Sequence, residues 1–342
     1  MKRLVICCDG TWQDLKTDYP TNVVKFVQAV KVRGDDDIVQ VVFYDPGVGT
    51  AGLKDKWIGG GLGKGIDTNI RECYRFLILN YDPGDEVYLL GFSRGAYTVR
   101  SLAGLIYCSG LPRREHIRRI GEAYELYRDP DVKPGSDKAK EFRQAYGGNI
   151  DITLLACWDT VGALGVPSHW LFNRKINKKY RFHDTILNRK IRHALHAVSI
   201  DERRRAFNVT PMDRADDAGG QTLSQIWFAG THGGVGGGSE ANAGLSDIAL
   251  QWMIDAVRGC GLGLAFETGC VHPPLCPDHT ISFKSALSLV DRILYGRIVR
   301  EVTGGFGDLH ESVKRRWHDC PDYRPPNLAD TFQAQLDAWG TN

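Results

Sequence analysis

Short apolar runs rich in β-branched residues recur along the chain, and each run ends at an aspartate or a glycine. Such runs are typical of buried strands. The five runs are Lys2 to Cys8, Ile38 to Tyr44, Glu86 to Leu90, Ile150 to Trp158 and Leu223 to Ala229. Strands that are buried on both faces belong to mostly parallel sheets covered by helices. The runs therefore predict an α/β fold with a mostly parallel sheet and helices on both of its faces.

Segments with helical spacing of apolar residues alternate with these runs. The four clearest segments are Asn69 to Asn80, Arg94 to Cys108, Lys190 to Ser199 and Leu245 to Val257. Because we find no internal repeat and no low-complexity linker, we expect a single domain over residues 1–342. Charged, helical sequence at about 112–148 indicates an insertion, and the weaker signals from about 262 onward indicate a C-terminal extension.

The composition is that of a chain that buries a core, with 42% apolar and 25% charged residues. A net charge of +2 gives no support to nucleic-acid binding, which requires a basic excess. No apolar run reaches the roughly 18 residues of a membrane helix, and the run from Leu4 to Cys8 is too short for a signal peptide. Nine scattered cysteines indicate free thiols, so we expect a cytoplasmic location in the producing cell.

The segment Gly91-Phe92-Ser93-Arg94-Gly95 lies between a predicted strand and a predicted helix. In that context the G-x-S-x-G pattern is typical of a sharp turn that lifts the serine hydroxyl above the sheet. The glycines leave room for a strained backbone and a closely packed helix, whose N-terminus points at the reacting carbon. Without that context the pattern is only a glycine-flanked helix cap. We therefore interpret Ser93 as a nucleophile.

A serine nucleophile needs a base, and the base needs a carboxylate that fixes its tautomer. In hydrolases of this kind the chain order is serine, carboxylate, histidine. Asp159 and His232 each follow the end of a buried strand, at the sheet edge where such folds bind ligands. The remaining candidates are His310 and His196 as the base, and Asp184 and Asp201 as the carboxylate.

Backbone amides near the serine are candidates for an oxyanion hole. The amide of Arg94 directly follows the nucleophile, and the loop after the first strand lies at the same sheet edge. We expect a second donor from Gly10 or Thr11 in that loop. The loop is equally typical of a turn in which the side chain of Asp9 caps Thr11 or Trp12.

The sequence indicates no metal site and no organic cofactor, and an acyl-enzyme mechanism requires neither. Gly63-Lys64-Gly65 departs from the phosphate-loop pattern, because neither serine nor threonine follows the lysine. His193 and His196 have the spacing of one helix face, but a third metal ligand is not evident.

Seven motifs occur in order from near the start of the chain to about Asp255. They are Cys8-Asp9-Gly10-Thr11-Trp12, Asn69-Ile70 through Tyr74-Arg75-Phe76-Leu77, Gly91-Phe92-Ser93-Arg94-Gly95-Ala96-Tyr97, Trp158-Asp159-Thr160-Val161-Gly162, Ile200-Asp201-Glu202-Arg203-Arg204, His232 to Gly238, and Gly244-Leu245-Ser246-Asp247. Together they resemble the α/β-hydrolase domain family that includes the type VI secretion phospholipase effectors (lipase effector family one). The resemblance implies a serine esterase of α/β-hydrolase-like fold that acts on lipid or phospholipid acyl esters.

The triad that the resemblance implies is Ser93, Asp159 and His232. The sequence departs from the family pattern after the histidine, where a small residue and an aspartate are expected and Gly233 and Gly234 stand instead. This departure motivates a rival hypothesis, a non-catalytic interaction module on a hydrolase scaffold. A third hypothesis is an esterase or thioesterase that acts on soluble substrates, because the sequence has no obvious amphipathic membrane anchor.

The partners that we expect follow from the esterase hypothesis. The main partner is a lipid or another ester substrate, with peripheral contact to a membrane and without nucleic acid. The resemblance is compatible with export by a specialised secretion system. The sequence does not indicate a particular protein partner.

Overall fold

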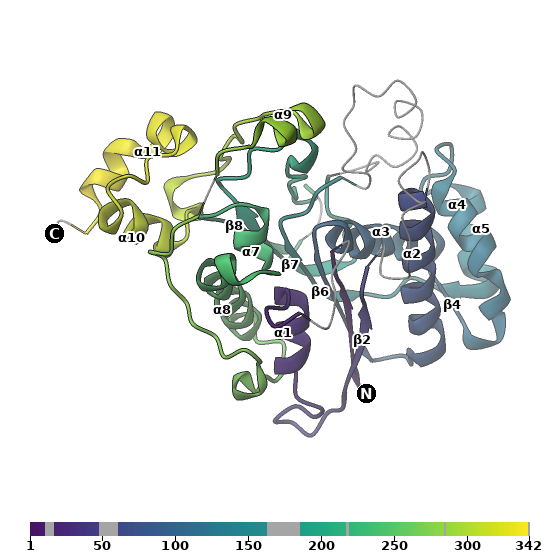
Figure 1. Ribbon diagram of the computed structural model, residues 1–342. Coiled ribbons are helices and arrows are strands. Elements are labelled where there is room, and N and C mark those ends of the chain that lie inside the picture. The colour runs from purple at the N-terminus through teal and green to yellow at the C-terminus, as the bar shows by residue number, and fades with distance from the viewer. Residues whose placement is uncertain (11–16, 48–60, 163–184, 217–218, 284, 341–342) are drawn as a thin grey trace.

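A six-stranded parallel sheet forms the centre of the protein in a computed structural model (Figure 1). The structure describes residues 1–10, 17–47, 61–162, 185–216, 219–283 and 285–340. The strands of the sheet are β1 (Arg3–Cys8), β2 (Gln40–Asp45), β3 (Glu86–Phe92), β6 (Ile152–Trp158), β7 (Ile191–Ser199) and β8 (Thr222–Phe228). They lie in the order β2-β1-β3-β6-β7-β8. The chain therefore changes direction across the sheet between β1 and β3, and such sheets bind ligands at the carboxyl edge of that point.

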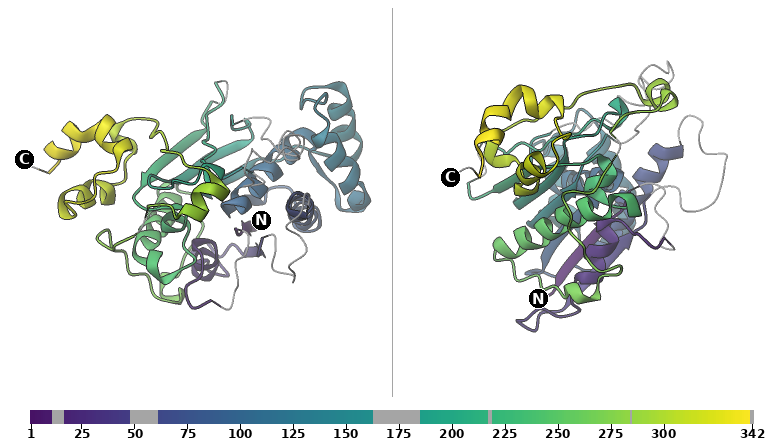
Figure 2. Two further views of the ribbon diagram at one scale, coloured as in Figure 1. Left: turned by 45° about the horizontal axis from the view of Figure 1, so that its top comes forward. Right: turned by 60° about the vertical axis from the view of Figure 1, so that its left-hand side comes forward.

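Helices cover both faces of the sheet (Figures 1 and 2). Alternate side chains of β1 point to opposite faces of the sheet, because Leu4 and Ile6 pack with one apolar cluster whereas Val5 and Cys7 pack with another on the other face. The helices are α1 (Asn22–Ala29), α2 (Gly61–Asn80), α3 (Arg94–Ser109), α4 (Ile120–Arg128), α5 (Asp137–Tyr146), α7 (His232–Gly236), α8 (Ala243–Gly259), α9 (Leu289–Tyr295), α10 (Glu311–Asp319) and α11 (Pro326–Ala338). The predicted α/β-hydrolase-like fold, with a parallel sheet between helical layers, is confirmed.

Strand β7 corrects one prediction. The apolar spacing of Lys190 to Ser199 predicts a helix, but the segment forms a strand between β6 and β8. A strand that is buried on both faces shows no strict alternation, so helical spacing can arise in it by coincidence. Residues three apart on a strand point to opposite faces, and His193 and His196 therefore do not share a face.

A charged, helical segment leaves the sheet after α3 and returns before β6. It contains a 3-10 helix (Arg114–Arg119) followed by α4 and α5. Its two ends are joined by a short antiparallel pair, β4 (Leu111–Pro112) with β5 (Gly147–Gly148). The segment packs on α2, where the hydroxyl of Tyr124 donates a 2.6 Å hydrogen bond to Asp67.

The chain beyond α8 first crosses α1 and then reaches the far edge of the sheet. The amide of Lys31 donates to the carbonyl of Ala265, and the amide of His310 donates to the carbonyl of Trp227 in β8. Helices α10 and α11 form a separate apolar cluster there, at the opposite end of the molecule from α4 and α5 (Figure 1). Further 3-10 helices are Arg205–Phe207, Glu240–Asn242, Thr268–Cys270 and Phe306–Asp308.

Candidate active site

Ser93 occupies a strained turn between β3 and α3. Its φ of 58° and ψ of −119° lie outside the regions that L-residues prefer. A Cβ at Gly91 would lie 2.5 Å from the carbonyl carbon of Gly95, and a Cβ at Gly95 would lie 2.0 Å from the carbonyl oxygen of Cys8. Both glycines are therefore required by close backbone contacts, and these contacts hold the serine at the carboxyl edge of the sheet.

His232 begins the short helix α7 after β8, and its imidazole lies between the serine and an aspartate. Its Nε2 is 2.8 Å from Oγ of Ser93, and its Nδ1 is 2.5 Å from Oδ2 of Asp159. The aromatic rings of Phe92 and Phe207 contact the imidazole, with centroids 4.6 and 5.1 Å away. The backbone amide of His232 donates to Glu202 at 3.2 Å. The structure thus brings Ser93, His232 and Asp159 into one hydrogen-bonded line.

Asp159 follows β6 and is fully buried, with a positive φ of 40°. Burial alone would raise the pKa of this carboxyl group. The charge of Arg300 and the hydrogen bonds from His232 and Arg300 outweigh burial, so the pKa of Asp159 lies well below its ordinary value. The carboxylate also accepts a 3.0 Å hydrogen bond from the amide of Ser199. Asp159 is therefore ionised and held from several sides.

Arg300 is the residue of this site that sequence reasoning missed. Its guanidinium is fully buried and donates to both carboxylate oxygens of Asp159, at 2.6 and 3.0 Å. It also donates to the backbone carbonyls of Ser199 and Phe207. A lone arginine between α9 and α10 carries no motif, so the sequence held no signal for this contact across 141 residues.

The first turn of α3 offers backbone amides next to Ser93. The side chain of Ser93, the residue before this turn, makes no capping hydrogen bond, so Oγ does not occupy the amides of the first turn. The amide of Gly10, the expected second donor of the oxyanion hole, is already hydrogen-bonded. The amide of Gly10 donates to the carboxylate of Asp9 at 2.7 Å, so it is not free for an oxyanion in this state. The side chain of Asp9 therefore caps a turn, as in the alternative interpretation, but at Gly10 and not at Thr11 or Trp12. Thr11 lies outside the described residues.

The side chain of Asp9 is deeply buried at this edge. It accepts hydrogen bonds from Thr21 at 2.6 Å and from Tyr44 at 2.9 Å, besides the one from Gly10. Burial raises its pKa to about 6, against the lowering effect of these hydrogen bonds. Asp9 therefore organises the loop that follows β1.

The two alternative bases have other partners. Nδ1 of His196 lies 2.8 Å from Gln225, and its Nε2 accepts from the amide of Thr160 at 3.2 Å. Burial lowers its pKa to about 3. His310 caps α10 by accepting from the amide of Ser312 at 3.2 Å, and burial lowers its pKa to about 4. Neither imidazole contacts Ser93.

The alternative carboxylates are also placed elsewhere. Asp201 is buried and accepts from the amide of Gly230 at 2.8 Å and from the hydroxyl of Tyr323 at 2.9 Å. Burial raises its pKa to about 6. It therefore holds the chain just before His232 rather than the imidazole itself. Asp184 lies outside the described residues.

One buried group among the described residues has metal-type donors, namely Cys8, Asp45 and Cys73. The two sulfur atoms are 3.5 Å apart and hydrogen-bond to each other. One oxygen of Asp45 accepts from Asn69 at 2.9 Å and from the amide of Gly47 at 2.7 Å. These contacts account for the group without an ion.

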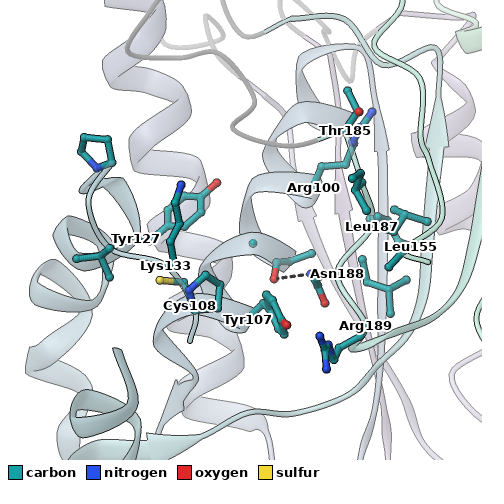
Figure 3. A pocket seen from close by; sticks show the side chains of 18 of the residues that line it. Arg100, Tyr107, Cys108, Tyr127, Lys133, Leu155, Thr185, Leu187, Asn188 and Arg189 are labelled. Atoms are coloured by element: carbon teal, nitrogen blue, oxygen red, sulfur yellow. Dashed lines mark hydrogen bonds between the residues drawn. The ribbon is translucent and has the colours of Figure 1, made fainter. Parts of the chain in front are cut away.

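A cavity of about 350 Å³ lies along the later turns of α3 (Figure 3). Tyr107, Tyr127 and Lys133 line one side, and Leu187 and Asn188 line the other. The side-chain amide of Asn188 donates to the carbonyl of Ala103 at 3.2 Å. Ser93, Asp159 and His232 do not line this cavity, so it is separate from the site described above.

Comparison with known proteins identifies the relatives of this chain. Residues 2–256 match the family model of the type VI secretion system (T6SS) "phospholipase effector Tle1-like, catalytic domain". A curated relative is the uncharacterised protein YEL023C of Saccharomyces cerevisiae, 27% identical over 237 residues, which are 62% of this chain and 33% of the relative.

Two solved structures are similar to this chain at low sequence identity. An uncharacterised protein from Pseudomonas aeruginosa has a TM-score of 0.52 at 20% identity, over 82% of this chain and 49% of that one. The Tle1 effector bound to the VgrG spike of the type 6 secretion system has a TM-score of 0.39 at 16% identity, over 71% and 52%. The first likeness supports the fold alone. The chain spans a third of the yeast relative and about half of each solved chain.

Proposed function

Because this chain belongs to the Tle1-like phospholipase effector family, we propose that it is a serine hydrolase that cleaves carboxylic esters of lipids or phospholipids. The supporting observation is the line of hydrogen bonds from Ser93 through His232 to Asp159, at 2.8 and 2.5 Å. A hydroxyl, an imidazole and a buried carboxylate in this order are the groups that acyl transfer to serine requires.

In the proposed reaction Oγ of Ser93 attacks the ester carbonyl while Nε2 of His232 takes its proton. Asp159 accepts the hydrogen bond from Nδ1 and stabilises the imidazolium that forms. The imidazolium then protonates the leaving alcohol, and an acyl-enzyme remains. Water, deprotonated by the same imidazole, attacks the acyl group and releases the fatty acid and the serine.

The negative oxygen of the tetrahedral intermediate needs donors on the opposite side from His232. The Arg94 amide and the positive end of the sixteen-residue helix α3 supply that stabilisation. A second donor, from Gly10, would require the bond to Asp9 to open. Loss of one such donor in other enzymes lowers kcat by about 10²- to 10³-fold.

Replacing Ser93 by alanine tests the proposal. Hydrolysis of short p-nitrophenyl esters and of phospholipid vesicles should fall by at least about 10⁴-fold, because Oγ is the attacking atom. Ser282→Ala, at an exposed serine, is the matched control. Full turnover in Ser93→Ala would contradict the proposal.

The same assays address the two rival hypotheses. A non-catalytic module would hydrolyse no ester in the native chain. An esterase for soluble substrates would cleave the p-nitrophenyl esters and leave phospholipid intact. Gly234 stands where the family pattern has an aspartate. The space around it does not require a glycine, because a Cβ at this position would meet no atom closer than 3.8 Å.

A further inference from the structure

Arg94 directly follows Ser93, and the described residues provide no hydrogen-bond or ion-pair partner for its side chain. Its Nε is buried and makes no hydrogen bond, and the described residues place no carboxylate against its guanidinium. The charged or titratable groups that act on it are Tyr295 and Arg204. The residue as a whole is partly exposed. Its guanidinium lies near Tyr295, whose ring contacts Phe207, and Phe207 in turn contacts the imidazole of His232.

Three other arginines around the site donate hydrogen bonds through their outer nitrogens, although Nε of Arg300 is also buried without a partner. Arg300 binds Asp159 through two nitrogens, and Arg204 binds Glu202 through two nitrogens at 2.8 and 2.7 Å. Arg100 donates to the carbonyls of Thr210 and Pro211, at 2.6 and 2.9 Å. Of the four arginines compared, Arg94 is the one whose outer nitrogens have no acceptor among the described residues.

A partly buried cation without a partner is unfavourable unless a ligand supplies the anion. The planar fork of arginine matches the oxygens of a phosphate, to which it can donate two parallel hydrogen bonds. Burial lowers the pKa of Arg94 to about 10, which leaves the group charged at neutral pH. The adjacent N-terminus of α3 adds a positive potential.

We propose that the guanidinium of Arg94 binds the phosphate of a glycerophospholipid while Ser93 attacks its acyl ester. The inference rests on the proposed ester hydrolysis and extends it, because it assigns recognition of the substrate's phosphate to one side chain. A neutral ester would leave Arg94 without an anion.

The test compares two soluble substrates, a short-chain phosphatidylcholine below its micelle concentration and a neutral p-nitrophenyl ester. In Arg94→Gln the ratio of the two kcat/KM values should fall at least about tenfold, mainly through KM for the phospholipid. In Arg94→Lys the ratio should fall by less, because lysine keeps the positive charge but lacks the planar guanidinium that donates two parallel hydrogen bonds. Arg118→Gln, at an exposed arginine of the insertion, is the control.

Competition gives a second readout. Glycerophosphocholine should inhibit hydrolysis of the neutral ester by the native chain more strongly than by Arg94→Gln. An unchanged ratio, or an equal loss for both substrates, would overturn the role of Arg94. Failure of the native chain to cleave either substrate would instead overturn the proposed function.

A second observation concerns α9, whose apolar side chains face solvent. The exposed fractions are 71% for Leu289, 63% for Val290, 66% for Ile293 and 45% for Leu294. The helix has no buried residue at all. Clustered exposed apolar side chains of this kind are typical of surfaces that bind a protein, a membrane or a ligand.

Helix α9 borders the candidate active site. Tyr295 at its end contacts Phe207, with ring centroids 5.8 Å apart, and Phe207 contacts His232. The amide of Arg205 donates to the carbonyl of Gly296, which joins the end of α9 to the turn that carries Phe207. The end of α9 is thus joined to the imidazole through the rings of Tyr295 and Phe207.

The charges around this face are basic. Arg205, Arg292 and Arg297 are exposed there and outnumber the one carboxylate of the helix, that of Asp291, which accepts a hydrogen bond from Ser288. Within the described chain, none of the helices is long and apolar enough to cross a bilayer. We infer that α9 rests on the surface of an anionic phospholipid membrane, with its apolar side chains among the acyl chains and its arginines at the headgroups.

Vesicle co-sedimentation in a Ser93→Ala background tests this inference without any turnover. Vesicles of phosphatidylcholine mixed with phosphatidylglycerol should bind the protein more tightly than vesicles of phosphatidylcholine alone. The double variant Leu289→Ser/Ile293→Ser should bind at least about tenfold more weakly. Val32→Ser/Leu79→Ser removes two exposed apolar side chains elsewhere and is the matched control.

Removing one positive charge separates the electrostatic contribution to vesicle binding. Arg292→Gln should weaken binding to the mixed vesicles by about fivefold and change binding to the neutral vesicles far less. Equal binding by the native chain and the Leu289→Ser/Ile293→Ser variant would overturn the inference. A dimer in gel filtration that these substitutions dissociate would overturn it as well, because a second copy would then cover α9.

Discussion

The region that matches the family and the region beyond it contribute differently to the site. Ser93, Asp159 and His232 all lie within residues 2–256, at turns that follow strands of the sheet. Arg300 and α9 lie beyond residue 256, between the sheet and the C-terminal helices. The first region therefore holds the groups proposed to react. The region beyond residue 256 holds Asp159 in place through Arg300 and presents the apolar face of α9 to solvent.

The difference shows which contacts a local sequence pattern can encode. A strand, a tight turn and a helix are neighbours in sequence, so the pattern around Ser93 specifies its own conformation. Arg300 reaches Asp159 only through the packing of distant segments. The two regions can be separated experimentally, since variants of one should affect chemistry and variants of the other should affect positioning and surface binding.

The largest effect after Ser93→Ala is expected for Asp159→Asn. An amide in place of the carboxylate favours the wrong tautomer of His232, so kcat should fall by about 10³- to 10⁴-fold. Steady-state hydrolysis of a p-nitrophenyl ester measures this, with the melting temperature as the check on folding. Asp201→Asn, at a buried carboxylate without a bond to the imidazole, is the comparison, and an equal loss in both variants would contradict the assignment.

Arg300→Met tests the contribution of the second region. Without the guanidinium, Asp159 is less well positioned, and kcat/KM should fall by about 10- to 100-fold. Loss of the positive charge also favours the imidazolium, so the acidic limb of the pH–rate profile should move to higher pH. A merely structural role would lower activity without moving that limb.

The same variant should show a pH-dependent loss of stability. In the native chain the pKa of Asp159 is lowered, so its stabilisation is present above its unfolded pKa of about 4 and is lost as pH falls through the lower folded value. Arg300→Met leaves the carboxyl buried without this partner, and burial then raises its pKa. Breaking such a pair typically costs about 3–5 kcal/mol. The melting temperatures of the two proteins should differ more at about pH 8 than at about pH 5, and a constant difference would argue against the charge as the cause.

The smallest effects are expected at residues that the site does not use. His310→Gln should retain the activity of the native chain, because this imidazole caps α10 and does not reach Ser93. Gly234→Ala should also fold and act normally, since a Cβ there makes only ordinary contacts. A large loss of turnover in His310→Gln, with the melting temperature unchanged, would reopen the choice of base.

The fold and much of the candidate site could be predicted from the sequence. Strand ends rich in aspartate and glycine indicated where Ser93, Asp159 and His232 would meet, because parallel strands end at the same edge. Strand β7 was missed, because full burial removes the alternation that distinguishes a strand from a helix. The bond between Gly10 and Asp9 depends on the buried surroundings of that carboxylate, to which Tyr44 contributes from another strand.

The most direct test of the central claim is the position of a covalent adduct after reaction with a fluorophosphonate. This reagent phosphonylates only a serine that a neighbouring base activates. Mass spectrometry of the digested native chain should find one adduct, on Ser93, and its formation should parallel the loss of esterase activity. An unmodified Ser93 in a chain that still hydrolyses esters, or an adduct on another residue, would contradict the account.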